Sequence, residues 1–218
     1  MTSKQAYEYF IIKINENATT DGVACDKGKF VKLFNSEQNK LIEHFLERRF
    51  EDDIRYIQAI LVDDKRLSSS NTHLDHVDFG LPKDYFDFSN LYITATKGQC
   101  TDKVDCFEIK DDDRNLVLRD TNLQPSFKHR ETPFHLSSNK IKIYFSGFDI
   151  DRAYLSYYRY PQQISLVNND DPESDFSTDP EFDDKFVNRV IDLTASSFFL
   201  NNDDQKFQAQ KIQAIQKP

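Results

Sequence analysis

Residues 134–161 read FHLSSNKIKIYFSGFDIDRAYLSYYRYP and decide the predicted fold of this chain. Within residues 140–145, apolar side chains alternate with polar ones, a two-residue period that is typical of a strand with one buried face. The pattern reverses before this run, at residues 138–139, and again after it, near Gly147. A second alternating run, residues 152–159, ends before a proline, which removes a donor from the ladder. The stretch is therefore predicted to be an antiparallel β-meander.

Helical periodicity flanks the meander on both sides. Ser3 is placed to cap a first helix. Residues 36–62 carry the longest amphipathic pattern and predict a second helix, with a break or bend expected near residues 51–53. Asp179 followed by Pro180 predicts the start of a closing helix. The apolar stripe of that helix is expected to be Phe182, Phe186, Val190, Leu193 or Thr194, and Phe198.

Polar segments connect these elements. Residues 17–29, the Ser-rich residues 67–71 and the acidic residues 165–179 are predicted to be loops or linkers. Residues 111–114, with the sequence Asp-Asp-Asp-Arg, are predicted to form a hairpin tip, because Asp tolerates turn conformations. Six strands are expected in the middle of the chain, at residues 91–96, 104–110, 115–119, 132–137, 140–145 and 152–159.

Together these patterns predict an α+β protein. The N-terminal part is helical, the centre is an antiparallel β-meander or small sandwich, and a closing C-terminal helix precedes an extended tail. We expect a helical region at residues 1–64, a β-rich region at 65–164, a linker and closing helix at 165–200, and a tail at 201–218.

Composition narrows the classes of function. The 218-residue chain has a formal net charge of -9, which opposes tight binding to the outside of a nucleic-acid duplex. An acidic surface lining a passage for DNA is compatible with that charge. Only 5 Gly are present and none forms a phosphate-cradling pattern, which argues against nucleotide binding. The sequence lacks a secretion signal and a membrane-spanning apolar run, so we expect a soluble, intracellular protein.

Three cysteines occur, an odd number that makes a poor disulfide framework. We expect reduced thiols, as in a cytoplasmic protein. Cys100 and Cys106 flank a polar turn, and a bridge between them across a hairpin is left open.

His73, Asp75, His76 and Asp78 form the sequence HLDHVD, which contains possible metal ligands. The segment follows a Ser-rich linker and precedes Gly80, so a helix that presents both histidines on one face is not expected. No further ligand group with recognisable spacing follows. A solvated loop is the favoured interpretation, and no metal site is predicted.

Three acidic clusters, at residues 111–113, 170–171 and 183–184, lack the glycine and closing glutamate of a calcium loop. Turn tips and helix starts account for them. No nucleophile elbow or oxyanion-hole motif is present. The chain is therefore predicted not to be an enzyme and to need no cofactor.

Tyrosines gather in residues 154–160, and stacked tyrosines can bind single-stranded nucleic acid. Such binding needs a basic groove, for which Arg152 and Arg159 are available. However, the alternation places tyrosines on both faces of the strand. Packing within a sheet is the favoured interpretation.

Three stretches in this order resemble a known family: LPKDYFDFSNLYI at residues 81–93, KIKIYF at 140–145 and AYLSYYRYP at 153–161. The chain resembles the head-to-tail adaptor proteins of tailed bacteriophages, which sit beneath the portal in short-tailed phages, including the crAss-like group. In that family a Leu-Pro-x-Asp-Tyr stretch opens the β region and a Tyr-x-x-x-Pro ending closes it. The matching residues here are Leu81, Pro82, Asp84, Tyr85, Tyr157 and Pro161.

The resemblance spans residues 36–200 and implies a structural virion protein of the neck or tail. Such proteins form a homo-oligomeric ring, commonly a dodecamer, that docks on the portal and extends the channel through which DNA passes without specific binding. They assemble in the host cytoplasm and contact neighbouring tail ring proteins. The β region here is longer and more Asp-rich than in helical connectors, so another ring of the tail or neck is an alternative.

The C-terminal tail is rich in Gln and Lys, with sparse apolar anchors at Phe207, Ile212 and Ile215. So little apolar surface does not order a segment by itself, although it can do so against a partner. We expect these three residues to dock on the portal or an adjacent ring subunit. A small monomeric binding protein, acting for instance on nucleic acid, is the alternative from a different class.

Overall fold

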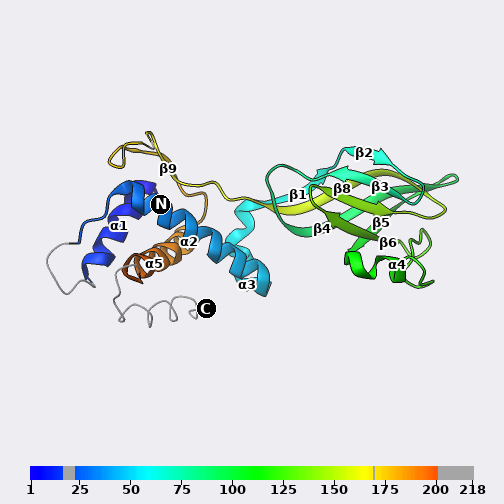
Figure 1. Cartoon of the computed structure of the whole chain (residues 1–218), viewed down its shortest axis with the longest axis horizontal. Helices are drawn as coiled ribbons and strands as arrows, with labels where there is room; N and C mark the ends of the chain where they lie inside the picture. The colour runs from blue at the N-terminus through cyan, green and yellow to red at the C-terminus, as the bar shows by residue number, and fades with distance from the viewer. Residues whose placement is uncertain (17–22, 169, 201–218) are drawn as a thin grey trace. The chain divides into compact units, whose positions relative to one another are not determined.

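A computed structural model describes residues 1–16, 23–168 and 170–200 (Figure 1). The chain divides into two compact units. The helical unit consists of Met1–Ala59 together with Pro161–Pro218, and the β unit consists of Ile60–Tyr160. The β unit is thus inserted between two segments of the helical unit. The predicted α+β class is confirmed.

Three long helices build the helical unit: α1 (Ser3–Glu16), α2 (Lys27–Arg48) and α5 (Asp184–Leu200). α5 packs against both α1 and α2. Aromatic rings form much of the core, since Phe10 contacts Phe30 at 5.1 Å and Phe198 at 5.8 Å between ring centroids. No helix in the described ranges is both long enough and apolar enough to cross a lipid bilayer.

The start of α1 corrects the predicted cap by one residue. Thr2 Oγ1 accepts a hydrogen bond from the Gln5 amide at 3.2 Å, and Gln5 Oε1 accepts one from the Thr2 amide at 2.9 Å. This reciprocal pair is a capping box. Ser3 is buried instead, and its hydroxyl donates to the Thr178 carbonyl at 2.6 Å. The side chain of Ser3 therefore ties α1 to the C-terminal segment.

The predicted helix at residues 36–62 is wrong at both ends. α2 begins directly after Asp26, whose side chain accepts from the Lys29 amide at 2.6 Å. It ends where Arg49 adopts the left-handed conformation, at φ 49°. A short α3 (Glu51–Ile54) and a 3-10 helix η1 (Arg55–Ile60) follow. Phe50 is 56% exposed, because the chain leaves α2 just before it.

The closing helix starts later than Asp179–Pro180 predicts. Asp183 Oδ1 accepts from the Phe186 amide at 2.8 Å and caps α5. Asp179 accepts from the Ser3 amide at 2.7 Å, so its carboxylate serves α1 instead. All members of the predicted stripe are buried. Within α5 they are Phe186, Val190, Leu193, Thr194 and Phe198, whereas Phe182 lies just before the helix.

The acidic segment at residues 165–179 is not a linker. β9 (Ser165–Leu166) pairs antiparallel with β10 (Phe176–Thr178). The Phe176 ring lies 5.9 Å from that of Tyr7 and 6.2 Å from that of Phe30. The aromatic ring of Phe176 thus anchors a mostly polar hairpin to α1 and α2. The polar composition of the whole segment does not reveal this single anchor.

The β unit is one sheet of eight strands in the order β1-β8-β4-β5-β6-β7-β3-β2. The strands are β1 (Leu61–Arg66), β2 (Ser69–Thr72), β3 (His76–Gly80), β4 (Tyr85–Lys97), β5 (Cys100–Glu108), β6 (Glu131–Ser137), β7 (Lys140–Tyr144) and β8 (Asp149–Arg159). β1 and β2 are at opposite edges, yet only Leu67 and Ser68 join them. The sheet must therefore curl until its edges approach, and its inner face encloses an apolar core.

The predicted meander is correct for its first hairpin only. β6 and β7 pair antiparallel, and Ser138 turns the chain with φ 52°. In the described sheet β8 is not a neighbour of β7, because it lies between β1 and β4, with Leu155 opposite Leu91. β4 and β8 are the two longest strands and pair along most of their length. Matching of strand lengths, rather than proximity in sequence, accounts for this choice of partner.

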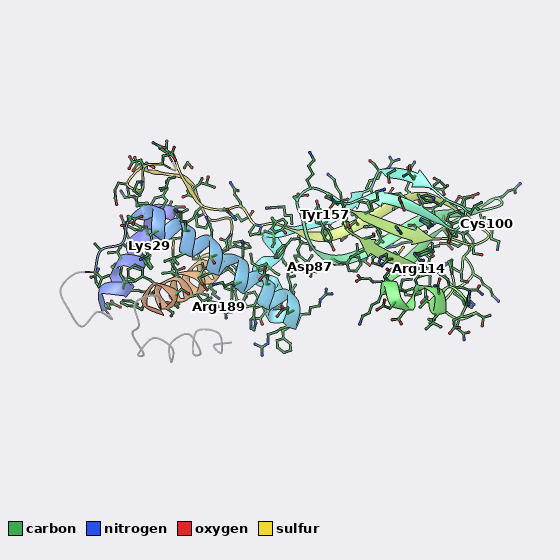
Figure 2. The ribbon with its side chains drawn as sticks, in the orientation of Figure 1. Lys29, Asp87, Cys100, Arg114, Tyr157 and Arg189 are labelled. Atoms are coloured by element: carbon green, nitrogen blue, oxygen red, sulfur yellow. The ribbon has the colours of Figure 1, made fainter. Side chains whose placement is uncertain are left out.

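Residues 111–119 contain neither the predicted hairpin tip nor the predicted strand. They form η2 (Asp111–Asp113) and α4 (Arg114–Val117). The reason is that β5 and β6 pair in parallel, and a parallel pair needs a crossover connection instead of a tight turn. Arg114, labelled in Figure 2, interacts from α4 with the hydroxyl of Tyr144, which is buried on the outer face of the sheet.

One further prediction fails in the β unit, and the question of a Cys100–Cys106 bridge is answered. Residues 67–71 are not a linker: Leu67 is buried and its amide donates to the Ala153 carbonyl at 2.9 Å, after which β2 begins. Cys100 and Cys106 both lie on β5, about 20 Å apart at the rise of an extended strand. That separation excludes the bridge left open above. All three described thiols are free.

Candidate functional site

The docking residues predicted for the tail, Phe207, Ile212 and Ile215, lie outside the described residues. The candidate sites considered below come from residues 1–200.

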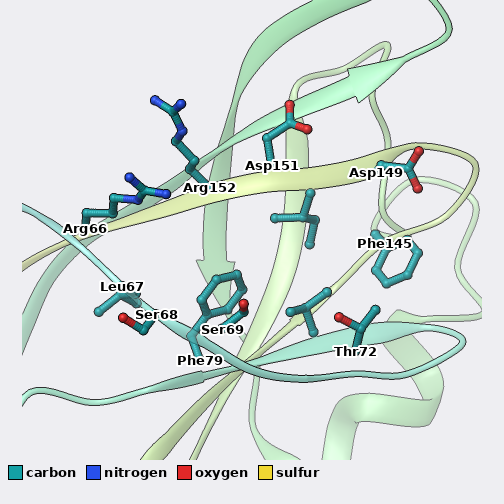
Figure 3. Close-up of a pocket in the computed structure, with 12 residues that line it drawn as sticks. Arg66, Leu67, Ser68, Ser69, Thr72, Phe79, Phe145, Asp149, Asp151 and Arg152 are labelled. Atoms are coloured by element: carbon teal, nitrogen blue, oxygen red, sulfur yellow. The ribbon is translucent and has the colours of Figure 1, made fainter.

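A groove of about 580 Å³ opens in the β unit where the two sheet edges approach each other (Figure 3). It is formed because the chain crosses from β1 to β2 through Leu67, while β8 and the turn before it lie opposite. Leu67, Val77 and Phe79 provide apolar lining. The other lining residues are Arg66, Ser68, Ser69, Thr72, Phe145, Asp149, Ile150, Asp151 and Arg152.

Charge is separated along this groove. Arg66 and Arg152 extend from one end, and Asp149 lies at the other (Figure 3). Asp151 is held in place by the Thr96 hydroxyl, which donates to Oδ2 at 2.7 Å. All four charged side chains are exposed. An apolar floor with exposed charges of both signs suits a protein segment better than a small anionic ligand.

A second cavity, of about 860 Å³, lies in the helical unit beside the first half of α2. Residues 163–166 line the other side of the cavity, and Asn35 binds them to α2. Its side-chain amide nitrogen donates to the Ile164 carbonyl at 2.9 Å, and its side-chain oxygen accepts from the Ile164 amide at 3.0 Å. The Gly28 amide donates to the Pro172 carbonyl at 3.1 Å. A Cβ added at Gly28 would lie 3.1 Å from Pro172 Cβ, so the two segments approach closely. The cavity is thus a well-braced surface depression.

The HLDHVD segment forms the turn and the start of β3 in a β-hairpin, so the predicted solvated loop is correct for the exposed residues 73–75 only. His76 and Asp78 belong to β3, and the His73 amide donates to the His76 carbonyl at 2.8 Å across a two-residue turn. Leu74, at the tip, is fully exposed. The imidazole rings of His73 and His76 stack with centroids 4.3 Å apart. Asp78, two residues beyond His76, is buried on the same face.

The sequence contains a weak indication of this cluster, namely a two-residue turn that brings His73 and His76 together. The turn of Leu74 and Asp75 between two short polar strands sets the register that brings His73 opposite His76. A search for helical ligand spacing does not find this arrangement, because in a hairpin the ligands come from opposite strands and from alternate positions of one strand.

The tyrosine-rich end of β8 packs inside the sheet. The Tyr154 ring stacks on Tyr92 with centroids 5.1 Å apart. Tyr157 is 2% exposed, and its hydroxyl donates to Asp84 Oδ1 at 2.9 Å (Figure 2). Burial, followed by the Asp84 carboxylate, raises the pKa of Tyr157 to about 12. These tyrosines act as structural anchors.

The acidic clusters occupy turns and helix starts, as predicted. Asp183 caps α5, and Asp111 to Asp113 form the turn of η2. Asp171 Oδ1 accepts from the Glu173 amide at 3.0 Å inside a turn. Each cluster thus has a local backbone role.

The cysteine environments disfavour thiolates. Burial raises the pKa of Cys25 to about 11 and also raises that of Cys106. Cys100 is the exposed thiol of the three. A nucleophilic cysteine needs the opposite surroundings, with nearby positive charge and access to solvent.

Comparison with known proteins adds no relative: no protein-family model matches the chain, and no curated protein matches it.

Proposed function

We propose that this chain is a structural ring subunit of a tailed-phage neck, a head-to-tail adaptor that docks on the portal and extends the channel for DNA. One observation carries the proposal. The two motifs of the family resemblance are far apart in sequence, yet they meet in the fold. The Tyr157 hydroxyl donates to Asp84, the Tyr160 amide donates to the Asp84 carbonyl at 2.9 Å, and the rings of Tyr85 and Tyr157 are 5.8 Å apart.

The contact gives the two motifs a common physical task. Together they close the end of the sheet where the chain enters β4 and leaves β8, beside Pro161. If the Leu-Pro-x-Asp-Tyr and Tyr-x-x-x-Pro motifs occurred here by chance, we would not expect them to contact each other in the fold. Their contact therefore supports a structural resemblance to the family.

The remaining features are compatible with a ring component. The net charge of -9 repels a DNA backbone and disfavours sticking to it in a channel. The groove with Arg66 and Arg152 at one end and Asp149 at the other offers a neighbouring copy complementary charges.

Assembly with the portal tests the proposal. The chain should be sized by sedimentation velocity over a range of concentrations, alone and with a candidate portal protein from the same genome. We expect a closed ring, or stoichiometric addition to the portal ring visible by negative-stain microscopy. A monomer that never joins the portal contradicts the proposal. Salt-dependent retention of DNA on a filter would instead favour the monomeric nucleic-acid binder.

The tail provides a sharper variant. Deleting residues 202–218 should leave the circular-dichroism spectrum of the folded units in place while abolishing portal binding. A matched full-length control replaces Phe207, Ile212 and Ile215 by Ser, which removes the apolar anchors and keeps the length. If both variants bind the portal like the parent chain, docking does not use the tail.

A further inference from the structure

We propose that His73, His76 and Asp78 bind one divalent transition-metal ion, Zn²⁺ by preference, on the outer face of the β2–β3 hairpin (Figure 1). The proposal is independent of the ring proposal. Three observations support it: the geometry of the ligand groups, a buried carboxylate oxygen without a hydrogen-bond partner, and a second carboxylate that orients one imidazole.

The hairpin places the three ligand groups on one face. His76 and Asp78 are alternate residues of β3, and His73 lies across the turn from His76. His76 Nε2 is 3.5 Å from Asp78 Oδ1, and His73 Nε2 is 3.8 Å from Asp78 Oδ2. The three ligand atoms all lie within 4.8 Å of one another. Tetrahedral zinc with bonds near 2.1 Å needs separations of about 3.4 Å, so a small inward movement of the exposed His73 completes the set.

Asp78 supplies the independent observation. The residue is 5% exposed, and within the part of the chain that the structure describes its Oδ1 atom is buried without a hydrogen-bond partner. Burying an unsatisfied carboxylate oxygen is costly, and buried charges are normally paired or bound to a metal. This oxygen faces His76 Nε2, so an ion between the two atoms would satisfy both.

Asp75 prepares His76 for this role. Its Oδ1 lies 2.6 Å from His76 Nδ1. A carboxylate oxygen in this position accepts a hydrogen bond from Nδ1, which leaves the Nε2 lone pair directed at Asp78 Oδ1. A carboxylate behind a ligating histidine is the usual outer shell of protein zinc sites.

Two nearby cations oppose metal binding. Lys140 Nζ lies 3.4 Å from Asp78 Oδ2, and the Arg114 guanidinium interacts electrostatically with Asp75. Lys140 faces Oδ2, whereas the unpartnered oxygen is Oδ1. The Lys140 side chain is 46% exposed, so it can turn toward solvent when an ion arrives.

The donor set selects the class of ion. Two imidazoles and one carboxylate suit zinc and other late first-row metals, whereas calcium and magnesium require oxygen ligands. Three protein ligands leave a fourth position for water. The site therefore resembles open zinc sites more than closed structural ones.

Direct binding of the metal to the chelator-treated full chain tests the proposal. Zn²⁺ is titrated by calorimetry, and Co²⁺ is added in parallel to record the visible absorption that four-coordinate cobalt gives. We expect one ion per chain, loss of binding in His73→Ala and His76→Ala, and affinity about 10–100-fold weaker in Asp75→Asn. Lys140→Ala should bind more tightly than the parent, a gain that a merely structural role of the cluster does not produce.

Matched controls exclude other zinc ligands. His44→Ala, His129→Ala and Cys100→Ser remove exposed or unrelated donors and should leave stoichiometry and affinity unchanged. His73 lies at an exposed turn, so its variant should keep the parent circular-dichroism spectrum even if Asp78→Asn does not fold. No binding to the parent chain, or undiminished binding to folded His73→Ala, overturns the proposal.

Discussion

The two units of this molecule reach stability in different ways. The β unit is one continuous stretch, Ile60–Tyr160, with an apolar core to which each strand from β3 to β8 contributes buried residues. The helical unit takes its helices from both ends of the chain, and its core depends on aromatic contacts between distant segments, such as Phe45 with Phe186 at 6.1 Å. The continuous unit contains every segment that its core needs. The discontinuous unit folds only when α5, from the C-terminal part of the chain, packs against α1 and α2.

Separating the units should produce the largest effect. Residues 60–160 expressed alone should fold cooperatively, because all eight strands and their core are present. Residues 1–59 alone should stay unfolded, since α5 is missing and the buried faces of α1 and α2 are uncovered. Circular dichroism with urea titration distinguishes the two outcomes. Cooperative unfolding of residues 1–59 would show that α5 is dispensable for the helical unit.

Core truncations should separate the units within the full chain. Phe186→Ala removes a fully buried ring from the helical unit and should cost about 3–5 kcal/mol. Leu91→Ala, its counterpart in the β unit, should cost about 2–5 kcal/mol. The chain lacks Trp, so helical circular dichroism reports one unit and tyrosine near-ultraviolet signals report chiefly the other. If each variant shifted both transitions equally, the units would unfold as one.

A buried carboxylate provides a smaller test in the helical unit. Glu37 on α2 is 3% exposed, and its Oε1 accepts from the Ser197 hydroxyl of α5 at 2.8 Å and from Lys40 at 2.7 Å. Ser197→Ala should cost about 1 kcal/mol, the net value of one hydrogen bond, measured as a shift of the helical urea midpoint. Ser36→Ala removes an exposed hydroxyl from α2 itself and serves as the control, which should cost less. Equal effects would mean that the α2–α5 bond adds nothing.

Alkaline pH should weaken the β unit through Tyr157. The pKa of Tyr157 is about 12 in the folded chain against 10.0 for an ordinary tyrosine. Below pH 10 the residue is protonated in both states. Between about pH 10 and 12 only the unfolded state loses the proton, so stability falls as pH rises. The urea midpoint of Tyr157→Phe should fall less steeply over this range than that of the parent, and parallel slopes would refute the assignment.

Local patterns predicted those elements whose periodicity is complete within the element. The hairpin of β6 and β7 and the buried stripe of α5 belong to this group, because alternate or helical spacing of apolar residues is visible in one stretch. Helix ends were less accurate, since Thr2 and Asp183 act as caps while Ser3 and Asp179, equally suitable by residue type, bond elsewhere.

Long-range pairing could not be predicted in this way. Nothing in the sequence of β8 indicates that it joins β4 instead of β7, and the parallel pairing of β5 with β6 is what turns residues 114–117 into a helix. The His73, His76 and Asp78 cluster likewise depends on hairpin register. Polar composition suggested a loop there because the inward-facing positions, Val77 and Phe79, are few.

The two edge strands of the curled sheet affect how copies of this chain behave at high local concentration. An unpaired strand edge is a template for another chain, and aggregation often begins there. β2 is a four-residue polar strand, and β1 carries Asp63, Asp64, Lys65 and Arg66, with a bulge where Asp64 adopts φ 48°. Both edges are therefore poor templates. Copies held at high local density should meet through side chains and keep their sheets separate, so that an assembly could be dense without becoming a fibre.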